Sequence, residues 1–250
     1  MNTSPPVSRV RLEHSHAREE IQQRLARDTQ ANYLRDWIYG GIDGTITTFA
    51  IVAGVIGANM PGSVVLVLGL ANLMADGFAM GAGNYSATKA ELDDYRRLLA
   101  IERKHIAVEP DGEREEIRQI FARKGFAGPE LERIVDVITA DEDRWAQTMA
   151  VEEYGLSPAV KSPLLAALST CAAFVLCGLV PLISYLLAYS MAWCVAATGL
   201  VFFAIGALKS RWSLSGWPRS GAETLLIGMS AAGLSFCIGY LLRAFVKLPV

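Results

Sequence analysis

Five apolar stretches, each about 20 residues long, set the strongest limit on how this chain can fold. They cover residues 37–58, 63–88, 164–187, 190–208 and 222–242. Stretches of this length predict transmembrane helices, because a helix satisfies all its backbone hydrogen bonds internally in lipid. From residue 159 onward the only acidic residue is Glu223, whereas residues 89–161 carry many charges of both signs. The sequence therefore predicts an all-α membrane protein with a polar insert between transmembrane helices 2 and 3.

This pattern divides the chain into four parts. Residues 1–34 predict a cytoplasmic N-terminal tail with an amphipathic helix, 35–88 transmembrane helices 1 and 2, 89–161 a cytoplasmic helical metal-binding insert, and 162–250 transmembrane helices 3 to 5. In the insert, helical runs at 90–108, 113–124 and 129–155 are separated by segments that contain proline and glycine, so we expect three helices. Residues 1–35 lack the apolar core of a cleavable signal, so we expect the first transmembrane helix to direct insertion.

Lysine and arginine residues predict the orientation in the membrane, because cytoplasmic loops close to the helices carry an excess of them. They cluster before the first helix, beside the insert, and between the fourth and fifth helices, whereas the turn at 59–63 is uncharged. We therefore predict that the N-terminus and the insert are cytoplasmic. The compact loops favour a bacterial inner (plasma) membrane, and we expect the vacuolar membrane if the source is eukaryotic.

Two of the apolar stretches contain groups that are costly to place in lipid. Asp43 lies in the first, and Asp76 and Met80 lie in the second. Carboxylates at membrane depth usually face a partner, a water-filled cavity or an ion path, and the helical rise places Asp43 and Met80 at similar depths. Carboxylate oxygen with thioether sulfur suits Fe²⁺ better than Mg²⁺ or Ca²⁺. The alternative is that Met80 fills the core and Asp43 pairs locally; the three residues together favour a functional site.

The insert contains three pairs of candidate metal ligands, each spaced to share one face of a helix. These pairs are Glu102 with His105, Glu113 with Glu116, and Met149 with Glu153; Glu109 and Glu152 are second-choice ligands. Such a set suits divalent transition metals, and the D-x-D-x-D-G run of a calcium loop is absent from the sequence. The alternative is a solvated acidic surface on which Arg103, Arg114 and Arg118 are interspersed.

Other candidate features point to no further chemistry. Cys171, Cys177, Cys194 and Cys237 lie in apolar stretches without C-x-x-C spacing, so we expect them to pack as small hydrophobic residues. His14 and His16 could bind metal, but histidines in a tail are more often solvated. A Gly-rich nucleotide-binding loop is absent from the sequence, so direct ATP drive is not predicted. We expect neither a prosthetic group nor a nucleic-acid partner.

Two motifs resemble those of the vacuolar iron transporter family. They are DWIYGGIDGTITTFAIVAGVIGA and ANLMADGFAMGAGNYSATKAE; a Glu-rich insert and GLVPLI follow, and the resemblance covers about residues 33–245. It implies a homodimer with five transmembrane helices per subunit that moves Fe²⁺, and in some cases Mn²⁺, out of the cytosol in exchange for protons, in metal homeostasis and detoxification. It also implies that Asp43 and Met80 line the ion path at the dimer interface.

The same resemblance implies that the insert binds metal near the mouth of the path. The six residues of the three pairs match the family's insert ligands, with two departures. His105 stands where family members commonly have glutamate, and Ala150 where a second methionine can occur. The number of metal ions in the insert and the preference between iron and manganese are therefore left open.

Two other functions compete with transport. One is a membrane-anchored metal sensor or buffer, which leaves Asp43, Asp76 and Met80 without a role. The other is a ferritin-like di-iron ferroxidase, because Glu102 and His105 form a Glu-x-x-His motif. Such sites need a second Glu-x-x-His motif, and we predict that neither of the other histidines, His14 and His16, belongs to one, so we expect a transporter and not an enzyme.

Overall fold

The computed structural model describes residues 16–26, 32–156, 161–188 and 190–246, and these residues contain helices and no strands. The helices are α1 (Arg18–Ala26), α2 (Leu34–Gly57), α3 (Gly62–Val108), α4 (Pro110–Arg123), α5 (Gly128–Thr139), α6 (Glu142–Glu152), α7 (Pro163–Ala188), α8 (Met191–Lys209), the short 3₁₀ helix η1 (Ser210–Trp212) and α9 (Trp217–Val246). Five of them, α2, α3, α7, α8 and α9, are long and apolar enough to cross a membrane. The prediction of an all-α protein with five such helices is confirmed.

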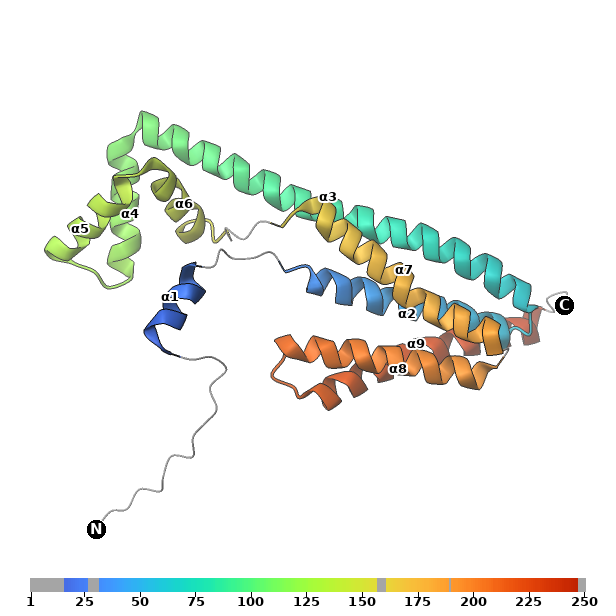
Figure 1. Cartoon of the computed structure of the whole chain (residues 1–250). Helices are drawn as coiled ribbons and strands as arrows, with labels where there is room; N and C mark the ends of the chain where they lie inside the picture. The colour runs from blue at the N-terminus through green and yellow to red at the C-terminus, as the bar shows by residue number, and fades with distance from the viewer. Residues whose placement is uncertain (1–15, 27–31, 157–160, 189, 247–250) are drawn as a thin grey trace, which may run out of the picture.

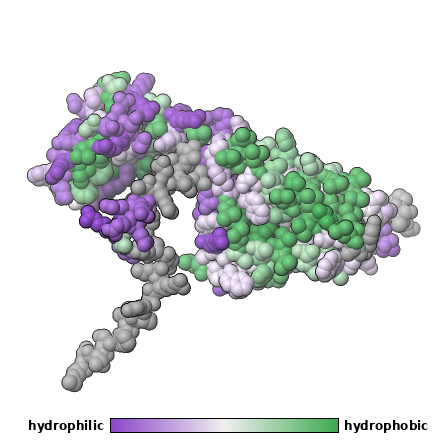
Figure 2. Space-filling model, in the orientation of Figure 1, coloured by the Kyte–Doolittle hydropathy of each residue, from purple (hydrophilic) through white to green (hydrophobic). Residues whose placement is uncertain are grey.

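The long helices pack side by side, and the short helices α4, α5 and α6 gather at the far end of α3 (Figure 1). The surface follows the same division, because hydrophobic residues cover the bundle and hydrophilic residues cover the short helices (Figure 2). The bundle therefore presents a surface suited to lipid, and the insert presents one suited to water.

Helices α2 and α3 run antiparallel and are joined by the tight uncharged turn that the sequence predicts. Asn59 closes the turn with φ 57°, a left-handed conformation that asparagine tolerates better than most residues. Pro61 follows in an extended conformation and precedes the first residue of α3, where a missing backbone N–H costs nothing. The short turn keeps the end of α2 close to the start of α3.

Helix α3 differs from the prediction in its length. The expected second transmembrane helix, 63–88, and the expected first helix of the insert, 90–108, form one continuous helix of 47 residues. Residues 84–108 contain no glycine or proline, and exposed ion pairs such as Lys89 with Asp93 bridge successive turns. The helix ends only at Glu109, before Pro110. A single rigid element about 70 Å long therefore connects the membrane with the insert.

The predicted helix at 129–155 is wrong, because this segment forms two helices, α5 and α6. Asp141 separates them: its side chain accepts a hydrogen bond from the backbone N–H of Arg144 at 2.8 Å and caps the start of α6. Glu142 and Asp143 add negative charge in the first turn, which favours a helix start at this point. The insert thus consists of α4, α5 and α6 packed beside the end of α3.

Glycines bring α7 into close contact with α2 and α3. A Cβ atom on Gly40 would lie 2.2 Å from the carbonyl oxygen of Thr170, and one on Gly44 would lie 2.2 Å from that of Phe174. On α3, Gly77 and Gly81 also face α7, so the predicted strip of small residues serves this contact. Helix α7 therefore fixes α2 and α3 relative to each other.

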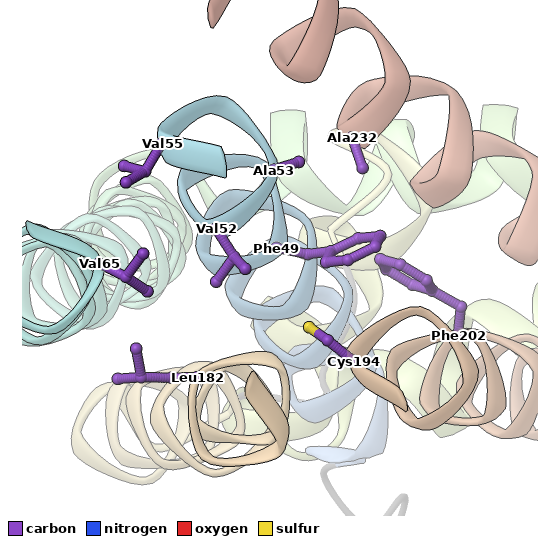
Figure 3. Packing of buried hydrophobic residues seen from close by; sticks show 9 residues of the cluster. All are labelled: Phe49, Val52, Ala53, Val55, Val65, Leu182, Cys194, Phe202 and Ala232. Carbon is purple, nitrogen blue, oxygen red and sulfur yellow. The ribbon is translucent and has the colours of Figure 1, made fainter. Parts of the chain in front are cut away.

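Buried apolar clusters hold both the bundle and the insert together. In the bundle, Phe49 and Phe202 lie with ring centroids 6.5 Å apart beside the buried Val52, Leu182 and Cys194 (Figure 3). In the insert, Ile117, Val135, Trp145 and Met149 form a second buried cluster. The cysteines follow the prediction only in part: Cys177 and Cys194 are buried, Cys171 is intermediate, and Cys237 is exposed on the outer surface of α9.

Candidate metal-binding sites

The first candidate site lies between α2 and α3 within the bundle. Asp43, Asp76 and Met80 are all partly buried. Asp76 is close enough to exert electrostatic repulsion on Asp43 across the two helices. Among the described residues, neither carboxylate receives a hydrogen bond or an ion pair, since Thr47 bonds only the main-chain oxygen of Asp43. The described residues therefore do not support the alternative that Asp43 pairs locally.

The register of α2 and α3 brings these residues to a common level. Asn84 Nδ2 lies 3.2 Å from Asp36 Oδ1, which fixes one point of contact between the antiparallel helices. Asp43 lies about 10.5 Å further along α2, and Asp76 lies about 12 Å from Asn84 along α3. Met80 lies between Asp76 and Asn84 on α3 and belongs to none of the buried apolar clusters of the described residues. Both carboxylates and the thioether thus occupy one segment of the interface between α2 and α3.

The second candidate site lies in the insert, where α3 ends and α4 begins. Potential ligand atoms of Glu102, His105 and Glu113 all lie within 4.8 Å of one another, and His105 Nδ1 is 3.3 Å from Glu113 Oε1. Glu102 and Glu113 are buried, with exposed fractions of 1% and 6%, while His105 is exposed. Two carboxylates and one imidazole therefore converge from two helices, with a path to solvent on the histidine side.

Two oxygens of this cluster are buried without a partner. When both carboxylates are ionised, Glu102 Oε2 and Glu113 Oε2 have no hydrogen-bond donor among the described residues, whereas Glu102 Oε1 accepts a hydrogen bond from the hydroxyl of Tyr154 at 3.1 Å. Burying an unpaired carboxylate oxygen is costly, so a bound cation would stabilise this arrangement. Oxygen and nitrogen donors of this kind suit divalent transition metals.

The raised pKa values of the carboxyl groups also favour a bound cation in this cluster. Burial raises the pKa of Glu113 to about 7, and the negative charges of Glu116, Glu102 and Glu153 contribute further. Burial also raises the pKa of Glu153, again with help from Glu116 and Glu102. The pKa of Tyr154 rises to about 12 through burial and the nearby Glu102, so its hydroxyl remains a donor. Four carboxylates thus repel one another around one point, and a divalent cation would relieve that repulsion.

Three neighbouring arginines form ion pairs with other acidic residues and not with this cluster. Arg103 pairs with Asp143 at 2.7 Å, Arg114 pairs with Asp136, and Arg118 pairs with Glu115 and Glu132. Each arginine is therefore occupied by an acidic residue outside the predicted ligand set. The alternative of a solvated acidic surface with interspersed arginines describes these outer pairs and not the buried Glu102 and Glu113.

The remaining predicted ligands lie in different surroundings. Glu116 and Glu153 are exposed and line one shallow pocket, together with Gln119, Ile120 and Arg123. Met149 is fully buried in the apolar core of the insert. Glu109 is exposed beside the start of α4, and Glu152 pairs with Lys124. Helix periodicity alone did not identify Tyr154, whose contact with Glu102 joins residues 52 positions apart. His14 lies outside the described residues.

Comparison with known proteins places this arrangement in a family. The model of the VIT family matches residues 34–240. The chain belongs to the VIT family. It is 34% identical over 215 residues to Vacuolar iron transporter 1 of Arabidopsis thaliana, covering 84% of this chain and 86% of the relative. It is 36% identical over 228 residues to Vacuolar iron transporter 1 of Eucalyptus grandis, covering 87% and 92%. For the Vacuolar iron transporter of Toxoplasma gondii, the identity is 30% over 235 residues, covering 88% and 77%.

The match confirms the family that the two membrane motifs indicate. The expectation that the chain is not an enzyme is confirmed at the level of the VIT family, whose relatives are named as transporters. The sequence does contain a second Glu-x-x-His run, from Glu13 to His16 in the N-terminal tail, and Glu13 lies outside the described residues. The prediction that neither His14 nor His16 belongs to such a motif is therefore wrong for His16, whose run lies in the N-terminal tail ahead of α1.

Proposed function

We propose that this VIT-family protein exports divalent iron, manganese or both from the cytosol across a membrane in exchange for protons. The observation that carries the proposal is the continuity of α3. One helix bears Asp76 and Met80 in the bundle and Glu102 and His105 in the insert, about 33 Å from Met80 to Glu102. The relatives' names support metal transport as the shared activity.

In this proposal the insert captures the metal ion. Glu102, His105 and Glu113 lie together within one chain, and two of their oxygens are buried without a partner. Glu116 and Glu153 add negative charge at the surface next to them, which raises the local concentration of cations. The insert therefore binds metal before the membrane site does, on the side of the membrane from which the ion departs.

The membrane site moves the ion in exchange for a proton. A carboxylate in apolar surroundings is stable with a bound cation or with a proton, because an uncompensated charge there is costly. Metal and proton therefore compete for Asp43, and metal binding releases the proton. If the two exchanges occur on opposite sides of the membrane, proton entry from the outer side displaces the ion outward and resets the carrier.

We also propose a homodimer. One protomer contributes a single Asp43, Asp76 and Met80, too few ligands for a dehydrated ion, and a two-fold axis would double them. Tyr39 lies one turn before Asp43 and is 65% exposed, so it marks the surface that would meet the second copy. Crosslinking through Tyr39→Cys should connect two chains, whereas Leu200→Cys on the outer surface of α8 should not. A monomer that transports at the full rate would contradict this.

The proposed orientation places the N-terminus and the insert in the cytosol. The cluster of arginines before α2 and the basic residues beside the insert support it. A bacterial inner membrane, or the vacuolar membrane in a eukaryotic cell, is the proposed location. Either location suits a role in removing excess metal from the cytosol.

The direct test is metal uptake into proteoliposomes under an imposed pH gradient, with Fe²⁺, Mn²⁺, Co²⁺ and Zn²⁺ compared. We expect uptake of Fe²⁺, Mn²⁺ or both, accompanied by proton movement in the opposite direction. A membrane-anchored sensor or buffer would bind these ions without moving them. Metal binding with no uptake of any of the four ions would therefore overturn the proposal in favour of that alternative.

A further inference from the structure

Asp36, the other acidic residue of α2, forms an ion pair with a lysine and belongs to neither of the predicted metal sites. Its side chain is only 12% exposed, and its Oδ2 lies 2.9 Å from Nζ of Lys161. Its Oδ1 lies 3.2 Å from Nδ2 of Asn84. Lys161 provides the only ion pair of Asp36 among the described residues and is itself 29% exposed. One ammonium therefore neutralises a nearly buried carboxylate.

The two partners of Asp36 differ in how firmly they are held. Asn84 is fixed, because its amide also contacts the hydroxyl of Thr170 at 2.7 Å and the carbonyl oxygen of Ala166 at 3.2 Å. Lys161 stands two residues before α7, outside any helix, and reaches Asp36 through a flexible four-carbon side chain. The amide therefore keeps the carboxylate in place, while the ammonium is the partner that can leave.

Asp36 lies between the insert and the membrane site when positions are measured along α2 and α3. It precedes Asp43 by seven residues, which places both on one face of α2 about 10.5 Å apart along the helix axis. Its partner Asn84 follows Met80 by four residues on α3 and lies between Met80 and the insert. An ion that leaves Glu102 and follows α3 toward Met80 therefore passes the Asp36 carboxylate before it reaches Asp43.

We propose that Lys161 is a tethered cation that closes this entrance, and that the transported divalent metal displaces its ammonium from Asp36. This inference rests on the proposed transport function. A buried carboxylate that is ionised needs a compensating cation, so Asp36 in its ionised form holds either the ammonium or the metal ion. While Lys161 occupies the position, its charge repels an approaching cation, and its return after the ion has passed opposes backflow.

The test compares the concentration of Fe²⁺ or Mn²⁺ that gives half-maximal uptake into proteoliposomes. Lys161→Gln removes the competing charge and should lower this concentration about two- to tenfold, while Lys161→Arg should leave it close to wild type. Lys161→Met serves as a second neutral variant if the glutamine variant folds poorly. Lys89→Gln is the matched control, because it removes an exposed lysine from an ion pair on α3 and should change nothing.

The outcomes separate this inference from the function on which it rests. An unchanged or raised half-maximal concentration in the neutral Lys161 variants, with or without a lower melting temperature, would make the pair a structural contact and overturn the gate. In that case wild-type uptake and its loss in Asp43→Asn would leave the transport proposal intact. Absence of uptake in the wild-type protein would instead overturn the transport proposal and the gate together.

Discussion

The two acidic sites of this protein differ in how complete they are within one chain. In the insert, Glu102, His105 and Glu113 meet within 4.8 Å, and both carboxylates are buried. In the bundle, Asp43 and Asp76 are only partly buried, and their carboxylates have no hydrogen-bonding partner among the described residues. Under the proposed function, the site that captures the ion is complete within one chain, whereas the site that releases it in the membrane would need further ligands from a second copy.

The largest effect should come from Asp43→Asn. The variant keeps the shape of the side chain but cannot exchange a proton for a metal ion, so uptake should fall by about 100-fold or more. Metal binding by the insert should be unchanged in calorimetry on the full-length protein in detergent. If this variant also loses metal binding by the insert, the two sites do not act separately.

The next effect should come from Glu113→Gln. Losing a ligand should weaken metal binding by the insert about 10- to 100-fold, and uptake should slow only at low metal concentrations. Glu115→Gln is the matched control, since Glu115 lies on the same helix but is exposed and pairs with Arg118. Equal calorimetric metal affinities for both variants would favour the alternative interpretation of the insert as a solvated acidic surface.

A smaller effect should come from Met80→Leu, which keeps the volume of the side chain and removes its sulfur. Uptake of Fe²⁺ should slow by about threefold to tenfold, and uptake of Mn²⁺, which prefers oxygen ligands, should change less. Met74→Leu serves as the control, because Met74 is 65% exposed on the same helix. Equal losses for the two ions would show that Met80 acts by packing and not through its sulfur.

The smallest effect concerns pH. The pKa of Glu113 is raised to about 7 in the folded protein, so between its ordinary value and pH 7 the folded state binds more protons than the unfolded state. Stability without metal should therefore fall as the pH rises through that range, while metal affinity should rise, since the ion binds the ionised carboxylate. Thermal melts and metal titrations at pH 5.5 and 7.5 measure both trends. Identical trends in Glu113→Gln would assign them to another group.

Much of the fold could be predicted from sequence because lipid restricts it so strongly. Apolar length gave the five transmembrane helices, and the turn around Asn59 and Pro61 followed from its residues. Two features of the insert did not follow. The charged residues that begin at Lys89 predict an end to the second transmembrane helix there. Residues 84–108 contain no glycine or proline, however, and α3 continues to Val108. Asp141 is of a residue type that favours helix starts, but the helical pattern on both sides of it predicts one continuous helix.

The depth estimate already placed Asp43 and Met80 together across two helices, but the site in the insert was predictable only within single helices. Helix periodicity pairs Glu102 with His105 because they share a face of α3. The position of Glu113 beside them depends on how α4 packs against the end of α3. The same reason explains why Met149 lies in the apolar core and why Tyr154 and Lys161 were missed. Their contacts, with Glu102 and Asp36, join residues that only the packing of helices brings together.

The most direct test of the account measures metal entry and proton exit in the same proteoliposomes for three proteins. The wild type should show both, in a fixed ratio. Glu113→Gln should take up metal more slowly at low concentration yet keep the wild-type number of protons per ion, because capture and exchange occur at different sites. Asp43→Asn, folded and still binding metal at its insert, should show neither movement. Proton-coupled uptake at the wild-type rate by Asp43→Asn would contradict the account.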